Sequence, residues 1–211
     1  ETKAVAKLPY PNYGGVLATA GNVVFNGGID GHFAAYDGCS MKELWSFDAG
    51  TGIRELGKEM LADPHLGIDR PCVVAFSHFH WDHIQGLPFF KPAYDARRSF
   101  TISAIGKERS KMDLHSIFGA QMQEEYFPVT LDGMGAKLEY LQTADDKIVN
   151  ENAYVSVVKH KHPGGAYSYR IEDTEGKVLV YCTDIEHGET LDPKIVELAR
   201  GADVLIHEGQ Y

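Results

Sequence analysis

The chain has 211 residues, of which 44% are hydrophobic and 24% are charged, values typical of a globular protein with a real core and not of a disordered one. Its formal net charge is −10 with the histidines neutral, so we expect no general nucleic-acid binding. No run of about 18 apolar residues occurs, so the sequence predicts no membrane span.

Three cysteines, Cys39, Cys72 and Cys182, do not suit a disulfide framework or a thiolate zinc site, because their number is odd and no C-x-x-C pair occurs. Cys72 and Cys182 fall in apolar, strand-like runs, so we expect both to be buried thiols. The first residue is Glu1, and no charged-then-apolar signal segment follows it. The compartment is therefore left open, with the cytoplasm as the expectation.

Glycine-rich turns separate short strands in the first fifty residues, in the stretches GGVLATAGNVVFNGG, GHFAAYDG and KELWSFDAG. A helix is predicted next, because apolar residues from Ile53 to Leu61 recur at helical spacing and Pro64 ends the pattern. The continuous apolar run PCVVAF at 71–76 predicts a buried strand, and SFTISAIG at 99–106 predicts the strand after it.

The second half of the chain combines helices and strands. A capping box formed by Ser110 and Asp113 predicts the start of one helix. Asp192 predicts the cap of another, and Gly201 stands where that helix should end. The remaining strands are expected at 137–141, 153–159, 165–172, 177–184 and 202–209. This order predicts an α/β (α+β) protein with two sheets covered by helices.

The stretch FSHFHWDHIQG at 76–86 places four ligand-type side chains in six positions, with the spacing H-x-H-x-D-H. A lone histidine at this point would be better explained as a solvated loop residue. This set directly follows an apolar run, however, and loops at strand ends commonly carry catalytic groups. Further ligand-type clusters follow the later strands. The four clusters are His78, His80, Asp82 and His83; His160 and His162; Asp184 and His187; and His207 and Glu208.

Imidazole and carboxylate groups point to a zinc-type metal centre. Zinc accepts both kinds of ligand, and a hydrolytic site leaves one position for water. A carboxylate can also bridge two ions held about 3.5–4 Å apart. Alternation along the loop would direct His78 and His80 to one ion, and Asp82 and His83 to its neighbour. His115, inside a predicted helix, is expected to be a surface or packing residue.

Together these motifs resemble the metallo-β-lactamase superfamily. The similarity runs from FDAGTGIRELG at 47–57 through QMQEEYFPV at 121–129 to HPGGAYSYRIE, YCTDIEH and LIHEGQY, and is greatest to the phosphodiesterase branch near ribonuclease Z. The resemblance implies a four-layer αββα sandwich and a hydrolase with one or two Zn²⁺ ions, with Mn²⁺ or Fe²⁺ as alternatives. It assigns His78, His80 and His162 to one ion, Asp82 and His83 to the second, and Asp184 to both as a bridge.

The resemblance also implies catalytic roles. A metal-activated water would attack phosphorus, with Asp82 orienting it. His207 would protonate the departing oxygen or hold the phosphate, and Glu208 would orient His207. A structural role for His207 is an equally good interpretation. His160 and His187 are expected to be neighbours of ligands and not ligands themselves.

Other chemistries of the superfamily can be weighed on single residues. β-Lactam cleavage is disfavoured because Asp184 stands where many β-lactamases have a cysteine ligand. Oxygen reduction is disfavoured because His80 stands where the di-iron flavoproteins have a glutamate. Hydrolysis of a thioester or lactone, as in glyoxalase II, stays open. We expect the substrate to be a small-molecule ester, in the first place a small or cyclic nucleotide-like phosphodiester. The flank WDHIQGLPFF is expected to pack the loop, although Trp81 or Phe89 could line a pocket.

Residues 12–53 instead resemble a propeller-blade segment of the quinoprotein alcohol dehydrogenases, including a tryptophan-docking motif around Trp45. One blade cannot form a quinone site, because a propeller needs about four to eight blades. We therefore expect one domain over 1–211, with an atypical strand segment at 1–50 and a metal-binding core at 51–211. A natural or engineered chimera is the alternative.

The superfamily's later GHS-like histidine has no counterpart before Tyr211. We therefore expect tight binding of the first ion and partial binding of the second, held by Asp82, His83, Asp184 and water. Alternatively another chain supplies a ligand, which leaves a homodimer open. The non-enzymatic alternative is a truncated or chimeric domain that binds metal without turnover.

Overall fold

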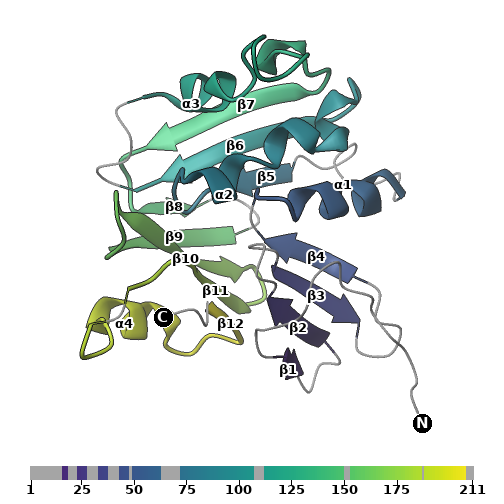
Figure 1. Ribbon diagram of the computed structural model, residues 1–211. Coiled ribbons are helices and arrows are strands. Elements are labelled where there is room, and N and C mark those ends of the chain that lie inside the picture. The colour runs from purple at the N-terminus through teal and green to yellow at the C-terminus, as the bar shows by residue number, and fades with distance from the viewer. Residues whose placement is uncertain are drawn as a thin grey trace. The chain divides into compact units, whose positions relative to one another are not determined.

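The structure is a computed structural model, which describes residues 49–62, 72–106, 112–149, 153–186 and 188–207, together with four strands before residue 48 (Figure 1). The chain forms two compact units. The first comprises Glu1–Ile102 and Leu114–Tyr140, and the second comprises Ser103–Asp113 and Leu141–Tyr211. The chain therefore passes from one unit to the other within two of its strands, β6 and β7.

The first unit begins with four short strands, as the glycine-rich turns predicted. They are β1 (Val16–Ala18), β2 (Val23–Gly27), β3 (Phe33–Asp37) and β4 (Glu43–Phe47). Each strand pairs antiparallel with the next, and they form a four-stranded sheet in the order β1-β2-β3-β4. A four-stranded antiparallel sheet is the architecture of one propeller blade, which agrees with the motif in this stretch.

A second sheet has the strand order β5-β6-β7, and its strands β6 and β7 begin in one unit and end in the other. Its strands are β5 (Cys72–Ala75), β6 (Ser99–Ile105) and β7 (Lys137–Thr143). The helices around it are α1 (Ile53–Ala62), α2 (Trp81–Ile84) and α3 (Leu114–Ala120), and short 3-10 turns lie at η1 (Leu87–Phe89), η2 (Lys91–Tyr94) and η3 (Leu131–Gly133) (Figure 1).

The prediction of a fully buried strand at 71–76 was wrong in part. Strand β5 spans 72–75, and its residues alternate between half-buried and exposed, with Val73 63% exposed. Cys72 is accordingly half-buried, whereas Cys182 is fully buried as expected. A run of apolar residues indicates a strand covered on both faces, but Val73 and Ala75, on one face of β5, are exposed.

Aromatic side chains fill the core of the first unit. Phe90 packs edge to face on Phe100, with ring centroids 5.2 Å apart, and Phe76 contacts Phe118 at 4.7 Å. Such pairs stabilise a core beyond the area that they bury. Because Phe76 is the first residue of the histidine loop, α3 supports that loop from behind through Phe118.

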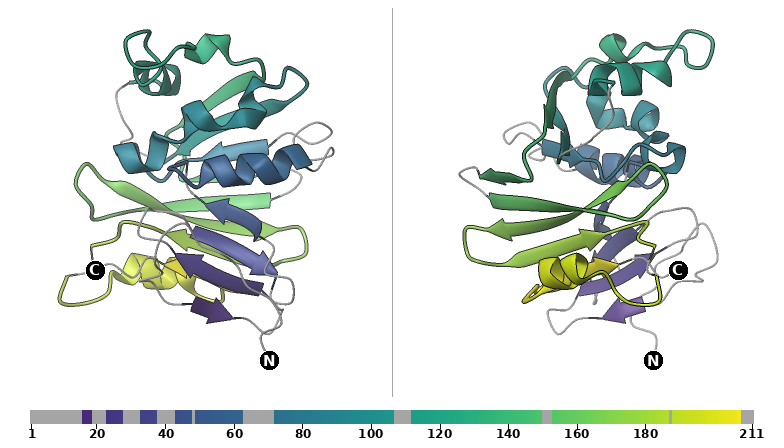
Figure 2. Two further views of the ribbon diagram at one scale, coloured as in Figure 1. Left: turned by 45° about the vertical axis from the view of Figure 1, so that its right-hand side comes forward. Right: turned by 90° about the vertical axis from the view of Figure 1, so that its left-hand side faces the viewer.

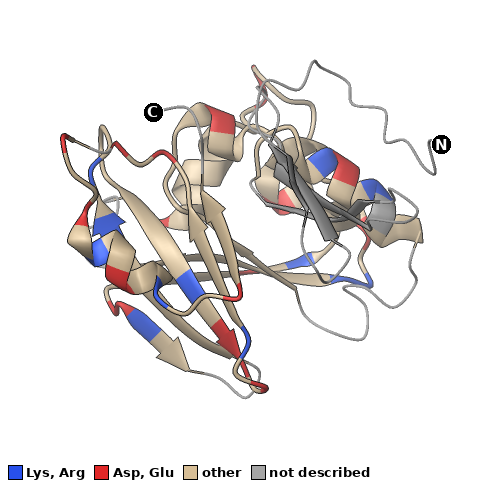
Figure 3. Ribbon diagram, turned by 90° about the horizontal axis from the view of Figure 1, so that it is seen from below, with Lys and Arg blue, Asp and Glu red and all other residues tan. Residues whose placement is uncertain are grey.

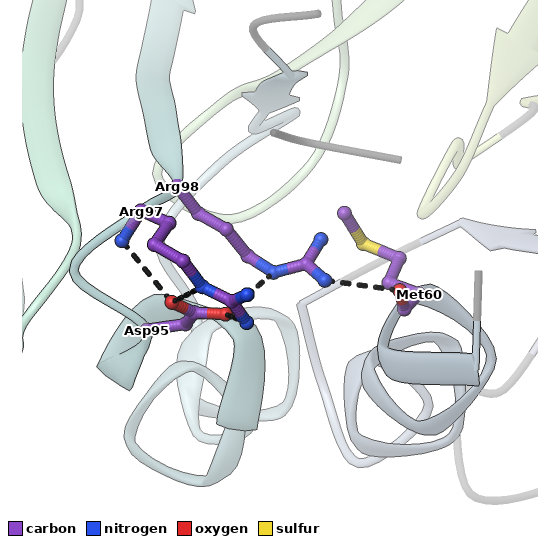
Figure 4. Close-up of polar contacts among 4 residues, drawn as sticks. All are labelled: Met60, Asp95, Arg97 and Arg98. Carbon is purple, nitrogen blue, oxygen red and sulfur yellow. Dashed lines mark hydrogen bonds and ion pairs between the residues drawn. The ribbon is translucent and has the colours of Figure 1, made fainter. Parts of the chain in front are cut away.

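A buried arginine joins α1 to the start of β6 (Figure 4). Arg98 donates hydrogen bonds to the carbonyl oxygen of Met60 at 3.3 Å and to the carboxylate of Asp95 at 3.4 Å. Arg97 pairs with the same carboxylate at 2.7 and 2.9 Å. These hydrogen bonds hold the pKa of Asp95 well below its usual range, and the hydrogen bond from the Arg97 side chain has the largest effect.

The second unit contains a five-stranded sheet in the order β12-β11-β10-β9-β8. Its strands are β8 (Lys147–Val149), β9 (Ala153–His160), β10 (Ala166–Asp173), β11 (Val178–Cys182) and β12 (Val204–His207). Neighbouring strands are antiparallel except β11 and β12, which are parallel. Strand β8 was not predicted, and β11 ends at Cys182, two residues before Asp184.

Helix α4 (Pro193–Ala199) packs on β9 and β10 (Figure 2). The predicted cap is present, because the side chain of Asp192 accepts a hydrogen bond from the backbone N–H of Lys194 at 2.9 Å. Gly201 has the positive φ expected after the helix. The core beneath α4 consists of Val178, Val180, Cys182, Ile185, Ile195 and Leu198.

Acidic and basic residues are interspersed along the described elements (Figure 3). Exposed ion pairs join Lys137 to Glu139 at 2.6 Å and Lys177 to Asp203 at 3.2 Å. Pairs of this kind contribute about 0–1 kcal/mol each. Of the helices in the described part of the chain, none has the length and hydropathy needed to cross a membrane.

Candidate metal centre

The histidine loop leaves the end of β5 and runs into α2. His78 and His83 are buried, while His80 and Asp82 are exposed. Gly86 closes the loop by donating a hydrogen bond to the carbonyl of Ala49 at 2.8 Å. A Cβ at Gly86 would overlap the backbone of Gly50, so only glycine fits this close approach.

His78 and His80 direct ring nitrogens at each other. The Nε2 atom of His78 lies 3.1 Å from Nδ1 of His80, and the two rings are edge to face. Ser77 Oγ lies 3.0 Å from the other nitrogen of His78, Nδ1. A hydrogen bond to one ring nitrogen fixes the orientation of the ring and leaves the other nitrogen for a ligand bond.

The spacing of these two nitrogens fits a metal ion. Two nitrogen ligands about 2.05 Å from a tetrahedral zinc ion are about 3.3 Å apart. The 3.1 Å between His78 and His80 is close to that separation. A zinc ion therefore requires only a small adjustment of these side chains.

Asp82 and His83 lie in the single turn of α2. The ring of His83 lies against that of His78, with centroids 4.2 Å apart, and its Nε2 is 3.6 Å from a carboxylate oxygen of Asp82. The loop therefore does not alternate as a strand would. The helical turn places His83 beside His78. The ring of His78 therefore contacts both His80 and His83.

In the second unit, the segment after β9, which carries His162, contacts the segment after β11, which carries Asp184. Nδ1 of His162 lies 3.9 Å from Oε1 of Glu186, and the backbone N–H of Glu186 donates to the carbonyl of Lys161 at 3.1 Å. This hydrogen bond ties the segment after β9 to the segment after β11. The HPGG motif continues as a turn in which Gly165 N–H donates to the carbonyl of His162 at 2.7 Å.

Asp184 has an unusual backbone. Its φ is 54°, and it is the only residue other than glycine with a positive φ in the described part of the chain. Aspartate tolerates this region better than most residues, but the conformation still costs about 1–3 kcal/mol. The hydroxyl of Thr183 donates to its carboxylate at 2.7 Å. A strained ligand-type residue at a strand end indicates a functional position.

His160 and His207 flank this turn. His160 is buried, and burial lowers its pKa to about 4, with smaller opposing effects of the backbone of Thr183 and of Asp184. His207 ends β12 and is paired in register with Cys182, at the sheet edge from which Asp184 follows. The predicted residues His187 and Glu208 lie outside the described residues.

The apolar flank of the loop packs against the core in part, and the two aromatic residues that were expected to be able to line a pocket are exposed. Ile84, Leu87 and Phe90 are buried, but Trp81 is 61% and Phe89 55% exposed. His115 matches its prediction, since it is an exposed histidine that bonds Asp132 at 2.8 Å within the first unit.

Each unit thus collects its own set of predicted ligands. The first unit holds His78, His80, Asp82 and His83, and the second holds His162, Asp184 and His207. Sequence reasoning missed the hydroxyl side chains that support them, Ser77, Thr183 and Ser168. Ser77 directly precedes His78 in the chain, and Thr183 directly precedes Asp184. A hydroxyl residue next to a ligand-type residue is therefore the sequence pattern that could have predicted these two.

A sequence model described as the beta-lactamase superfamily domain matches residues 46–211. Human tRNase Z, short form, has a similar structure, with 17% identity and a TM-score of 0.52 over 98% of this chain and 75% of that protein. A diphosphatase from the PhnP family is 17% identical over 84% of this chain and 59% of its own, with a TM-score of 0.49. The family match and tRNase Z confirm the predicted metallo-β-lactamase fold.

The quinoprotein resemblance is also confirmed over a short part of the chain. The quinoprotein ethanol dehydrogenase of Pseudomonas aeruginosa is 60% identical over 43 residues, which are 20% of this chain and 7% of that protein. Lupanine 17-hydroxylase of a Pseudomonas species is 54% identical over 83 residues, 39% of this chain and 11% of the enzyme. The chain therefore spans about a tenth or less of the length of these relatives.

Proposed function

The chain belongs to the beta-lactamase superfamily, whose members are mostly hydrolases, and from this premise we propose that it hydrolyses a small or cyclic nucleotide-like phosphodiester with the help of bound metal. The proposal of a phosphodiester rests on the sequence motifs HPGGAYSYRIE and LIHEGQY. The structural similarity to a tRNase agrees with it.

We assign the metal ligands as the sequence motifs suggest. His78, His80 and His162 would hold one ion, Asp82 and His83 the second, and Asp184 both. Zn²⁺ is our first choice, because the proposed set combines imidazole nitrogens with carboxylate oxygens. Mn²⁺ and Fe²⁺ are the alternatives. Bound ions would lower the pKa of a water molecule and neutralise charge that develops on the phosphoryl oxygens.

The side chains have separate tasks in this proposal. Asp82 is exposed at the end of the loop, where its carboxylate can accept a hydrogen bond from the attacking water and orient it. His207, at the end of β12, would donate a proton to the departing oxygen. Glu208, the next residue, would hold the His207 ring in the orientation that this transfer needs.

The single observation that carries the proposal is the pair of nitrogens on His78 and His80, 3.1 Å apart and held by Ser77. Two imidazole nitrogens at this separation can both bind one divalent ion, and the hydroxyl of Ser77 fixes the orientation of the buried ring of His78.

A paired assay tests the proposal. Hydrolysis of a chromogenic phosphodiester is compared with hydrolysis of a thioester, each with and without a chelator. We expect phosphodiester turnover that the chelator removes and zinc restores. His80→Ala should lower this turnover at least about 100-fold, whereas His115→Ala, the matched exposed histidine outside the loop, should not. Faster cleavage of the thioester would instead assign a glyoxalase II-like reaction, and binding of zinc without either activity would indicate a domain that binds metal only.

A further inference from the structure

An exposed aromatic pair lies in the first unit, on segments outside the histidine loop. Phe89 ends η1 and is 55% exposed, and Phe127 is half-buried. The two rings meet edge to face, with centroids 5.4 Å apart and planes at 88°. In such a pair each ring covers at most one face of its partner. Part of the aromatic surface of Phe89 is therefore open to solvent.

The backbone holds Phe89 in this exposed position. Its neighbours Leu87 and Phe90 are each 1% exposed and are therefore fixed in the core. The hydroxyl of Tyr94 donates to the carbonyl of Pro88 at 2.7 Å, which fixes the residue between them. A side chain that is held at the surface in this way loses little conformational entropy when a flat ligand binds to it.

The segment that carries Phe127 is also well structured. It follows α3, and the backbone N–H groups of Tyr126 and Phe127 both donate to the carbonyl of Gln123 at 2.9 Å. This turn belongs to the stretch QMQEEYFPV at 121–129, to which the proposed metal centre assigns no role. Both rings of the pair are thus carried by segments with fixed backbones.

The chain keeps Phe89 close to the proposed metal ligands of the first unit. Phe89 follows His83 by six residues, which lie in α2, in a turn and in η1. Because helical turns rise by only about 1.5–2.0 Å per residue, the Cα atoms of Phe89 and His83 are within about 12 Å of each other. A substrate with its phosphate at the ligands can therefore reach Phe89 with a ring that is attached through a sugar.

Shape and charge favour a single nucleobase as the occupant of this surface. Every nucleobase has a flat π face, and bases stack on exposed aromatic side chains whatever their sequence. Glu124 and Glu125 are exposed and directly precede Tyr126, so this segment carries negative charge that repels further phosphates. The formal net charge of −10 also disfavours a polynucleotide.

We propose that Phe89 and Phe127 form a base-binding subsite. The nucleobase of a mononucleotide phosphodiester stacks on the ring of Phe89, which Phe127 holds in place, while the phosphate lies at the metal ligands. This inference rests on the proposed function and narrows its substrate to a phosphodiester that carries a base. The subsite contributes to binding and not to the chemical step, so its loss raises KM and leaves kcat little changed.

The test compares two probes by isothermal titration of the zinc-loaded protein. Adenosine monophosphate and ribose phosphate share the phosphate and the sugar, and only the first has a base. The wild type should bind adenosine monophosphate at least about 5-fold more tightly, and Phe89→Ala should bind the two probes equally. Phe127→Ala should reduce the preference. Val149→Ala, which shortens an exposed apolar side chain in β8 of the second unit, should keep it.

Two further variants distinguish stacking from apolar contact. Phe89→Tyr keeps the aromatic ring and should keep the preference for the base, whereas Phe89→Leu keeps an apolar side chain without a π face and should lose most of it. Equal affinity of the wild type for the two probes would overturn the inference, as would failure to bind adenosine monophosphate. An undiminished preference in Phe89→Ala, or its loss in Phe89→Tyr, would do the same.

These measurements need no turnover, so the two proposals can fail separately. A preference for the base that depends on Phe89, in a protein without phosphodiester turnover, would leave the inference standing and overturn the proposed function alone. Metal-dependent turnover of a chromogenic phosphodiester, in a protein that binds the two probes equally, would overturn the inference alone.

Discussion

Phe118 offers the sharpest test of how the fold supports the histidine loop. Its side chain is 0% exposed and lies between two aromatic residues of that loop. The ring contacts Phe76 at 4.7 Å and Phe79 edge to face at 6.4 Å, and these two residues flank Ser77 and His78 in the sequence. Removal of the ring therefore withdraws the packing behind a proposed metal ligand.

The magnitude follows from burial and ring contacts. Phe118→Ala should lower the free energy of unfolding by about 3–5 kcal/mol, the usual cost of a fully buried phenylalanine. Each lost ring contact accounts for about 0.5–1.5 kcal/mol of this change. Phe89 is the matched control, because it also contacts one aromatic residue, Phe127 at 5.4 Å, but is 55% exposed. Phe89→Ala should cost about 1 kcal/mol or less.

Urea unfolding of the two variants measures this difference, and a zinc competition assay run under folding conditions measures its effect on the loop. Zinc binding should weaken in Phe118→Ala and stay unchanged in Phe89→Ala. Equal destabilisation by the two substitutions, or a loss under about 1 kcal/mol in Phe118→Ala, would refute the role of Phe118 as the support of the histidine loop.

Three further predictions concern other parts of the structure. Gly86→Ala should fold poorly or displace the histidine loop, because a Cβ would overlap the backbone of Gly50, and a zinc affinity equal to that of the wild type would contradict this. Asp184→Asn should reduce the bound zinc measured by metal analysis while unfolding by urea changes little, since asparagine also tolerates a positive φ; undiminished zinc would exclude a bridging role. The pKa of Asp203 is lowered from 3.8, first by the hydrogen bond from Val178 N–H, so its contribution to stability is present above that value and is lost as the pH falls through the lower folded value. Asp203→Asn should therefore reduce the loss of stability measured as the pH falls below about 5, and an unaltered loss would count against this hydrogen bond.

Local signals predicted much of this architecture. Asp192 and Gly201 marked the two ends of α4, because caps and helix stops depend on the chemistry of single residues. The helix predicted to begin after Ser110 and Asp113 is α3, which starts at Leu114. The H-x-H-x-D-H spacing predicted which side chains the loop contributes, and the structure brings His78, His80 and His83 into contact.

Features that depend on distant parts of the chain were not predictable in this way. Val73 is exposed although it lies in an apolar run, because burial depends on what packs against the strand. The expected strand at 177–184 ends at Cys182, since the left-handed backbone of Asp184 breaks it. Ser168 looks like any serine in an alternating strand, and only the antiparallel register brings it to His160.

The contact between His78 and His80 has a consequence for how the protein would acquire an ion. A hydrogen bond between two imidazoles places a proton in the space between their nitrogens, where a cation would have to enter. His78 is enclosed, so only the exposed ring of His80 can exchange that proton with water. Binding of an ion would then replace this proton, at a rate that depends on the buffer. Acid would slow ion binding because it keeps the proton between the two nitrogens.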